Sequence, residues 1–178
     1  SALLVEDGKI DAGGLFGKLR RPAYLSFELA AALQYLNVLF GDGQTMDKLK
    51  EIAADEKASI ELRKSALQSL VDAKAFGTED LCEKLLNKRF LNLVAAKGLA
   101  NSERADISGM ILKNYRRFHP SERSQVISLL ASRASWAENL LNAIQRNQIL
   151  REELSPYQAR QIASHEKPRL NELLADTW

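Results

Sequence analysis

Three side chains in this sequence belong to types that perform nucleophilic, metal-binding or acid–base chemistry: Cys82, His119 and His165. A single cysteine forms neither an internal disulfide nor a cysteine cluster for a metal. Because Cys82 lies in a helical pattern, we interpret it as a small apolar packing residue rather than a reactive thiol. The histidines lie one and three residues before a proline. Without suitably spaced carboxylates they do not make a typical zinc site, so a capping or turn role is predicted for both.

Motifs of known catalytic sites do not occur in the sequence. The glycine-rich segment 13–19 contains Gly-Lys but lacks the hydroxyl residue and the spacing of a phosphate-binding loop. The metalloprotease His pair, the nucleophile elbow and the haem-attachment Cys-x-x-Cys-His are absent from the sequence. The carboxylate pairs Asp55-Glu56 and Glu152-Glu153 fall on polar turns, which indicates solvated faces. We therefore predict no catalytic, cofactor-binding or metal-binding residue and no cofactor.

Basic residues gather at segments 18–21, 88–89 and 113–117. In the last, Tyr115 lies among Lys113, Arg116 and Arg117, and such mixing of rings and cations occurs in nucleic-acid sites. The same cations fall in the last turn of an expected helix, where they complement the helix dipole. The net charge of +2 gives no general attraction to nucleic acid. We keep Lys113, Arg116 and Arg117 as a candidate basic patch, with nucleic acid as the less favoured partner.

Trp136 lies in the first turn of an expected helix and in register with Leu140. An indole at that position is more typical of an anchor that packs one repeat against the next than of a platform for a ligand. We therefore predict a structural anchor made of Trp136, Leu140 and the nearby Arg133.

The elements that position these residues are predicted to be helices, because the apolar spacing is helical throughout. Three of the four prolines fall where a helix would begin. Thr45, Ser102 and Ser155 are expected N-caps, and Gly77 and Gly98 are expected to end helices. The expected helices cover about residues 23–40, 46–54, 60–74, 78–87, 89–97, 102–118, 121–132, 135–147, 155–164 and 168–176.

Composition places the 178 residues among ordinary globular chains, with 46% apolar and 27% charged residues. No stretch reaches the roughly 18–20 apolar residues of a membrane span. The first residues lack a signal peptide and an initiator methionine, so an internal segment of a longer protein is expected. Residues 1–22 are predicted to be irregular and residues 23–178 to form one helical repeat domain.

A weak internal repeat supports stacked helix pairs. The pattern of segment 63–70 returns in segment 123–130, and more loosely in segment 104–111. Each copy has an early basic residue, then an apolar pair, then an apolar residue one turn later, as helices packed on two neighbours require. The fold class that follows is all-α, an α-α superhelix of the HEAT/ARM type with nine or ten short helices. An irregular helical bundle is the alternative.

The stretch from Ser121 onward resembles the long, exported, membrane-associated dehydrogenases of planctomycetes and verrucomicrobia. The motif that carries the resemblance is Leu-Ala-Ser-Arg-x-x-Trp-Ala-x-x-Leu-Leu-x-Ala-Ile, intact at Leu130–Ile144, and the likeness continues through Leu154–His165. Residues 121–178 match well, residues 45–120 match only as generic helical repeats, and the first 44 hardly match. In that family a sugar-dehydrogenase-type propeller precedes HEAT-like helices, and a small c-type cytochrome domain follows them.

The resemblance implies a spacer role in an exported, periplasmic or otherwise extracytoplasmic redox protein. This sequence carries neither the propeller nor the haem motif, so no catalytic or haem-ligating residue is transferred to it. The function expected is a non-catalytic scaffold that contacts neighbouring domains or another protein. The alternatives are a stand-alone protein- or peptide-binding module, a nucleic-acid-binding helical repeat that would use Arg20 and Arg21 as well, and an independent enzyme.

Overall fold

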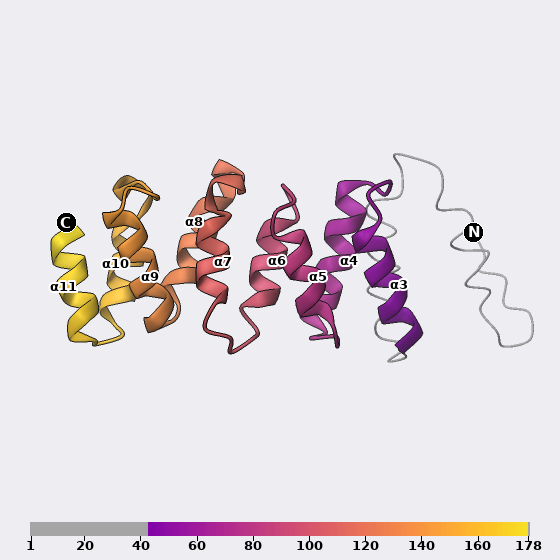
Figure 1. The fold of residues 1–178 in the computed structure, drawn as a ribbon, viewed down its shortest axis with the longest axis horizontal. Helices are drawn as coiled ribbons and strands as arrows, with labels where there is room; N and C mark the ends of the chain where they lie inside the picture. Colours follow the sequence, from indigo (N-terminus) through magenta and orange to yellow (C-terminus); the bar gives the residue numbers. More distant parts are fainter. Residues whose placement is uncertain (1–42, 178) are drawn as a thin grey trace, which may run out of the picture.

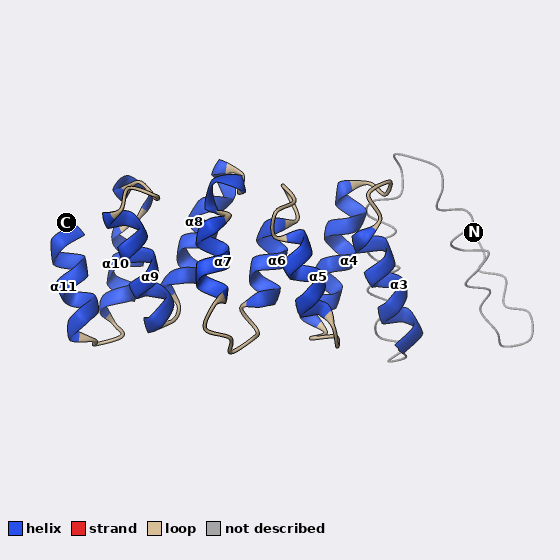
Figure 2. Cartoon of the chain, viewed as in Figure 1, coloured by secondary structure: helices blue, strands red, loops and turns tan. Residues whose placement is uncertain are grey.

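The computed structural model of the chain describes residues 43–177 (Figure 1). All regular structure within these residues is helical, with nine α-helices and two short 3-10 helices and no strand (Figure 2). The predicted all-α class is therefore confirmed for this part of the chain, while the expected helix over 23–40 and the irregular segment 1–22 lie outside it. The elements are α3 (Gly43–Ala54), α4 (Ile60–Asp72), α5 (Thr78–Leu85), α6 (Asn92–Leu99), α7 (Ile107–Lys113), η1 (Tyr115–Arg117), α8 (Pro120–Ala131), α9 (Ala134–Gln145), η2 (Arg151–Glu153), α10 (Pro156–Ala163) and α11 (Pro168–Thr177).

The helices follow one another along the long axis of the molecule in chain order (Figure 1). Their contacts define two layers. In one layer α4 packs on α6, α6 on α8 and α8 on α10; in the other α3 packs on α5, α7 on α9 and α9 on α11. Pairs such as α3 with α4 and α5 with α6 join the layers. The first layer begins its helices at Ile60, Asn92, Pro120 and Pro156, so the chain returns to it every 28 to 36 residues.

Capping explains where several helices begin. The prolines of α8, α10 and α11 occupy the first helical turn, as predicted, where a missing N–H leaves no bond unmade. Ser155 Oγ accepts from the N–H of Gln158 at 3.3 Å, and the Gln158 side chain accepts from the N–H of Ser155 at 2.9 Å. This reciprocal pair is a capping box, which confirms Ser155 as an N-cap.

Two other predicted N-caps are wrong. Thr45 lies inside α3, because that helix begins at Gly43. Ser102 does not start a helix either. Its hydroxyl accepts from the N–H of Arg104 at 3.4 Å and so favours a local turn, and α7 begins only at Ile107. The helix expected to reach Phe118 is split, because α7 ends at Lys113 and η1 follows it.

The expected helix over 89–97 begins later, at Asn92, because Phe90 adopts a left-handed backbone with φ of 70°. Gly77 takes the left-handed conformation, with φ of 74°, directly before α5, in keeping with its predicted role as a break. Gly98 lies inside α6 and does not end it, contrary to the prediction. Its actual role is close packing, because an added Cβ would lie 2.6 Å from Cys82 Sγ and 2.7 Å from Val71 Cγ2.

One continuous apolar core connects the described helices. It extends from Leu49 in α3 to Leu174 in α11 and includes side chains from both layers. The core is made mainly of leucine, isoleucine, valine and alanine, with Phe118 its largest fully buried side chain. Each helix therefore depends on its neighbours along the chain for burial, as repeat architectures require.

Candidate functional site

Cys82 is fully buried on α5. Burial raises the pKa of its thiol to about 12, and the nearby Glu79 carboxylate adds to the rise. A thiol with such a pKa carries almost no thiolate at neutral pH, so it is a poor nucleophile. The structure thus places Cys82 as the packing residue that the sequence predicts.

We expect the native chain to resist labelling of Cys82 by Ellman's reagent at pH 8, and to react stoichiometrically in denaturant. The reason is that both access and deprotonation require the helix α5 to leave the core. Absorbance of the released thiolate measures the reaction. Rapid labelling under native conditions, at the rate seen for the unfolded chain, would contradict the assignment.

The two histidines cap helices, as predicted. His119 Nδ1 accepts from the backbone N–H of Ser121 at 3.4 Å. The backbone N–H of His119 donates to Glu122 Oε2 at 3.3 Å, and this second bond closes a capping box on α8. His165 Nε2 lies 2.9 Å from the carbonyl oxygen of Ala131, at the C-terminus of α8. Both side chains thereby satisfy backbone groups that a helix end leaves unpaired.

Arg133 repeats this arrangement one helix earlier in the same layer. Its guanidinium donates to the carbonyl oxygens of Ala100 at 2.6 Å and Ser102 at 3.0 Å, directly after α6. The same guanidinium carbon lies 4.6 Å from the ring centroid of Trp136, which is 3% exposed. Arg133 and His165 therefore each join the end of one helix to the residues that follow the next helix of the same layer. Both junctions have the same local sequence, an alanine and a serine followed by a basic residue, at Ala131–Arg133 and Ala163–His165. This shared pattern could have predicted both contacts.

Arg104 binds a cluster of carboxylates. Its Nη1 donates to the carboxylates of Glu79, at 3.0 Å, and Glu83. Its Nη2 donates to the carboxylate of Asp106 at 2.6 Å. The guanidinium lowers the pKa of the Asp106 carboxyl. These contacts tie α5 to the loop before α7, and since all four side chains are surface-exposed in part, we interpret the cluster as a structural clamp.

Tyr115 is buried and its hydroxyl donates to Glu153 of η2. Burial, with the adjacent carboxylate, raises the pKa of this phenol well above its usual range. Arg123 covers the ring at 5.6 Å from its centroid and lies 3.8 Å from Glu153. The aromatic member of the predicted basic patch is therefore enclosed, and it offers no exposed ring for a base to stack on.

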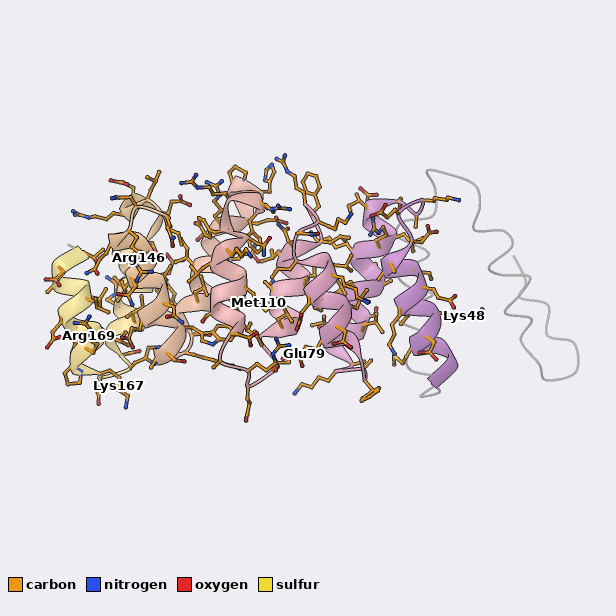
Figure 3. The ribbon with its side chains drawn as sticks, in the orientation of Figure 1. Lys48, Glu79, Met110, Arg146, Lys167 and Arg169 are labelled. Carbon is orange, nitrogen blue, oxygen red and sulfur yellow. The ribbon has the colours of Figure 1, made fainter. Side chains whose placement is uncertain are left out.

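The remaining members of the predicted basic patch separate into two groups. Lys113 and Arg116 line a groove of about 720 Å³ between α7 and α9, whereas Arg117 is exposed but does not line it. Arg146, which follows α9 directly and is labelled in Figure 3, lines the same groove. The sequence analysis missed Arg146, because no local signal connects it to residues thirty positions earlier. Arg20 and Arg21 lie outside the described residues.

No helix among residues 43–177 has both the length and the apolarity needed to cross a membrane. Nor does this part of the chain bring together three or more histidine, cysteine or carboxylate side chains in a geometry that could hold a metal ion.

Comparison of the chain with protein-family models, with curated protein sequences and with solved structures gives no significant match.

Proposed function

We propose that this chain is a non-catalytic α-solenoid scaffold of the HEAT-like type, which mediates contacts between protein domains. The observation that carries the proposal is the continuous core through two layers of successive helices. Such a stack grows by repetition and presents long lateral surfaces, which suits it to holding other domains at a defined separation. The spacing of 28 to 36 residues between successive helices of one layer is shorter than the roughly 40–47 residues of HEAT units, so the proposal describes these units as a compact variant of that type.

The use of the reactive side chains supports a structural role. Cys82 packs in the core, while His119, His165 and Arg133 complete the hydrogen bonding of helix ends. Each of these groups already has a physical function in holding the stack together. These structural uses of the cysteine and of both histidines are what a scaffold role expects.

We place the module in a larger exported redox protein, between a dehydrogenase domain and its electron-accepting cytochrome domain. The support is the resemblance at Leu130–Ile144, whose motif contains the buried Trp136, Leu140 and Leu141 and the junction residue Arg133. The motif describes how one repeat joins the next, so it is suited to a spacer. On this proposal the partners are domains of the same polypeptide, and the compartment is extracytoplasmic.

The complete reading frame tests this context. We expect a propeller-type domain upstream of the helices and a Cys-x-x-Cys-His haem-attachment motif downstream of them. A frame with neither would reject the redox context and leave the alternative, a stand-alone protein- or peptide-binding module. The groove between α7 and α9 is the observation that favours that alternative.

A further inference from the structure

The α7–α9 groove combines side chains that pack in the apolar core, such as Ala143, with exposed polar side chains that the packing of the helices leaves unused. Its floor is formed by small and apolar residues, including Gly109, Leu112 and Ala143. Gly109 has open space where a side chain would lie, and this leaves the backbone of α7 accessible along the groove. An extended segment in the groove would therefore meet no side chain at Gly109.

Three cations surround this floor: Lys113, Arg116 and Arg146. Within the described residues none of the three forms a hydrogen bond, an ion pair or a ring contact. The carboxylate that also lines the groove, Asp106, is already held by Arg104 at 2.6 Å. Elsewhere, Arg104, Arg123 and Arg133 all have partners in the protein. The groove thus has a net positive charge without internal compensation, which attracts an acidic ligand.

Amide side chains complete the lining. Asn139 donates to Ser108 Oγ at 2.8 Å, which leaves its carbonyl oxygen available, and Asn142 and Gln148 lie nearby with no side-chain hydrogen bond to the described residues. An amide both donates and accepts, so it matches the C=O and N–H of a peptide backbone. Phosphate groups only accept, and Tyr115, the aromatic residue that lines the groove, is only 2% exposed, so it presents almost no ring surface on which a base could stack. This chemistry favours a peptide over a nucleic acid.

We propose that the α7–α9 groove binds an extended, acidic peptide segment of a partner polypeptide. The carboxylates pair with Lys113, Arg116 and Arg146, and the peptide backbone bonds to the amides of α9 and the residues after it. The inference rests on the proposed function, since it specifies the chemistry of one contact that the scaffold makes. The two proposals can fail separately, because the reading frame that tests the redox context does not depend on peptide binding in the groove.

Fluorescence anisotropy with the full chain tests the proposal. The probe is a fluorescein-labelled decapeptide that alternates glutamate with leucine and alanine, and its glutamine counterpart is the neutral control. We expect the acidic peptide alone to bind, and its binding to weaken as salt screens the charges. The double change Lys113→Glu with Arg116→Glu should weaken binding about tenfold or more, because two exposed attractions become repulsions.

A matched variant separates the groove from general electrostatics. Arg117→Glu with Lys167→Glu makes the same change in residue types and net charge, but neither side chain lines the groove. This variant should bind within about twofold of the unmodified chain, since only weak long-range attraction is lost. A third variant, Gly109→Trp, fills the open space without a change in charge and should also abolish binding. Circular dichroism establishes that all three are folded.

Several results would overturn the proposal. Equal weakening by both double variants would show non-specific attraction, and no binding at low salt would show that the groove is not a peptide site. Tighter, groove-dependent binding of a labelled thymidine oligonucleotide would make nucleic acid the ligand. Concentration-dependent self-association that Lys113→Glu with Arg116→Glu removes would make a second copy of the chain the occupant.

Discussion

Replacement of Trp136 by alanine is expected to lower the free energy of unfolding by about 3–5 kcal/mol, the range measured for truncation of large buried aromatics. The indole projects from α9 and is 3% exposed, and the guanidinium carbon of Arg133 lies 4.6 Å from its ring centroid. Its loss leaves a cavity and also removes the surface on which Arg133 is held over the end of α6. The damage therefore reaches two successive repeats.

Urea denaturation followed by circular dichroism measures this change. Tyr157→Ala is the control, because that aromatic side chain is 69% exposed and its removal should shift stability by no more than about 0.5 kcal/mol. Arg133→Lys separates the two contributions, since lysine keeps the charge but loses the planar fork that reaches both carbonyls. Equal denaturation midpoints for Trp136→Ala and Tyr157→Ala would contradict the anchoring role.

Alanine at Gly98 is expected to destabilise the chain by about 1–3 kcal/mol, although alanine is the better helix former. The new methyl group would lie 2.6 Å from Cys82 Sγ and 2.7 Å from Val71 Cγ2, both shorter than van der Waals contact. Cys82 is fully buried and Val71 is 6% exposed, so neither can move aside without disturbing the core. Helices α4, α5 and α6 would have to separate.

Gly109→Ala is the matched control, because it makes the same substitution in the next helix along the chain. Its added methyl group meets nothing within 4 Å, so the gain in helix propensity should stabilise the chain by about 0.5–1 kcal/mol. Thermal unfolding of the two variants should therefore shift in opposite directions. Stabilisation by both substitutions would show that α6 does not approach α5 and α4 as closely as the structure places it.

Local chemistry made much of the fold predictable. Helix starts depend on contacts within one turn. The sequence therefore allowed a correct assignment of the first-turn prolines Pro120 and Pro156, and of the N-cap Ser155, which has a glutamine three positions later. The helical spacing of apolar residues likewise identified each described α-helix, but it did not predict the split before Phe118 or the 3-10 helix η2. These features depend on neighbours in the sequence, which a single sequence displays.

Features that depend on distant residues were mispredicted or missed. Gly98 was expected to end a helix, because its true constraint comes from Cys82 and Val71 on other helices. The contact between Arg133 and the carbonyl oxygen of Ser102, thirty-one residues earlier, was not predicted, because nothing local connects the two residues. The groove escaped notice because Arg146 meets Lys113 and Arg116 only when α7 and α9 pack in one layer. Long-range packing of this kind leaves no local pattern.

The most direct test of the scaffold function uses the complete polypeptide, with residues 43–177 replaced by a flexible Gly-Ser linker. Two rates are measured in the polypeptide that the proposed redox context predicts: reduction of a soluble dye by the proposed dehydrogenase domain, and reduction of the haem in the proposed cytochrome domain. A non-catalytic spacer predicts that dye reduction is retained while haem reduction falls, because a flexible linker no longer fixes the distance between the domains. Loss of dye reduction would show that the helices take part in the chemistry, and unchanged haem reduction would show that they do not position the domains; either result contradicts the proposed function.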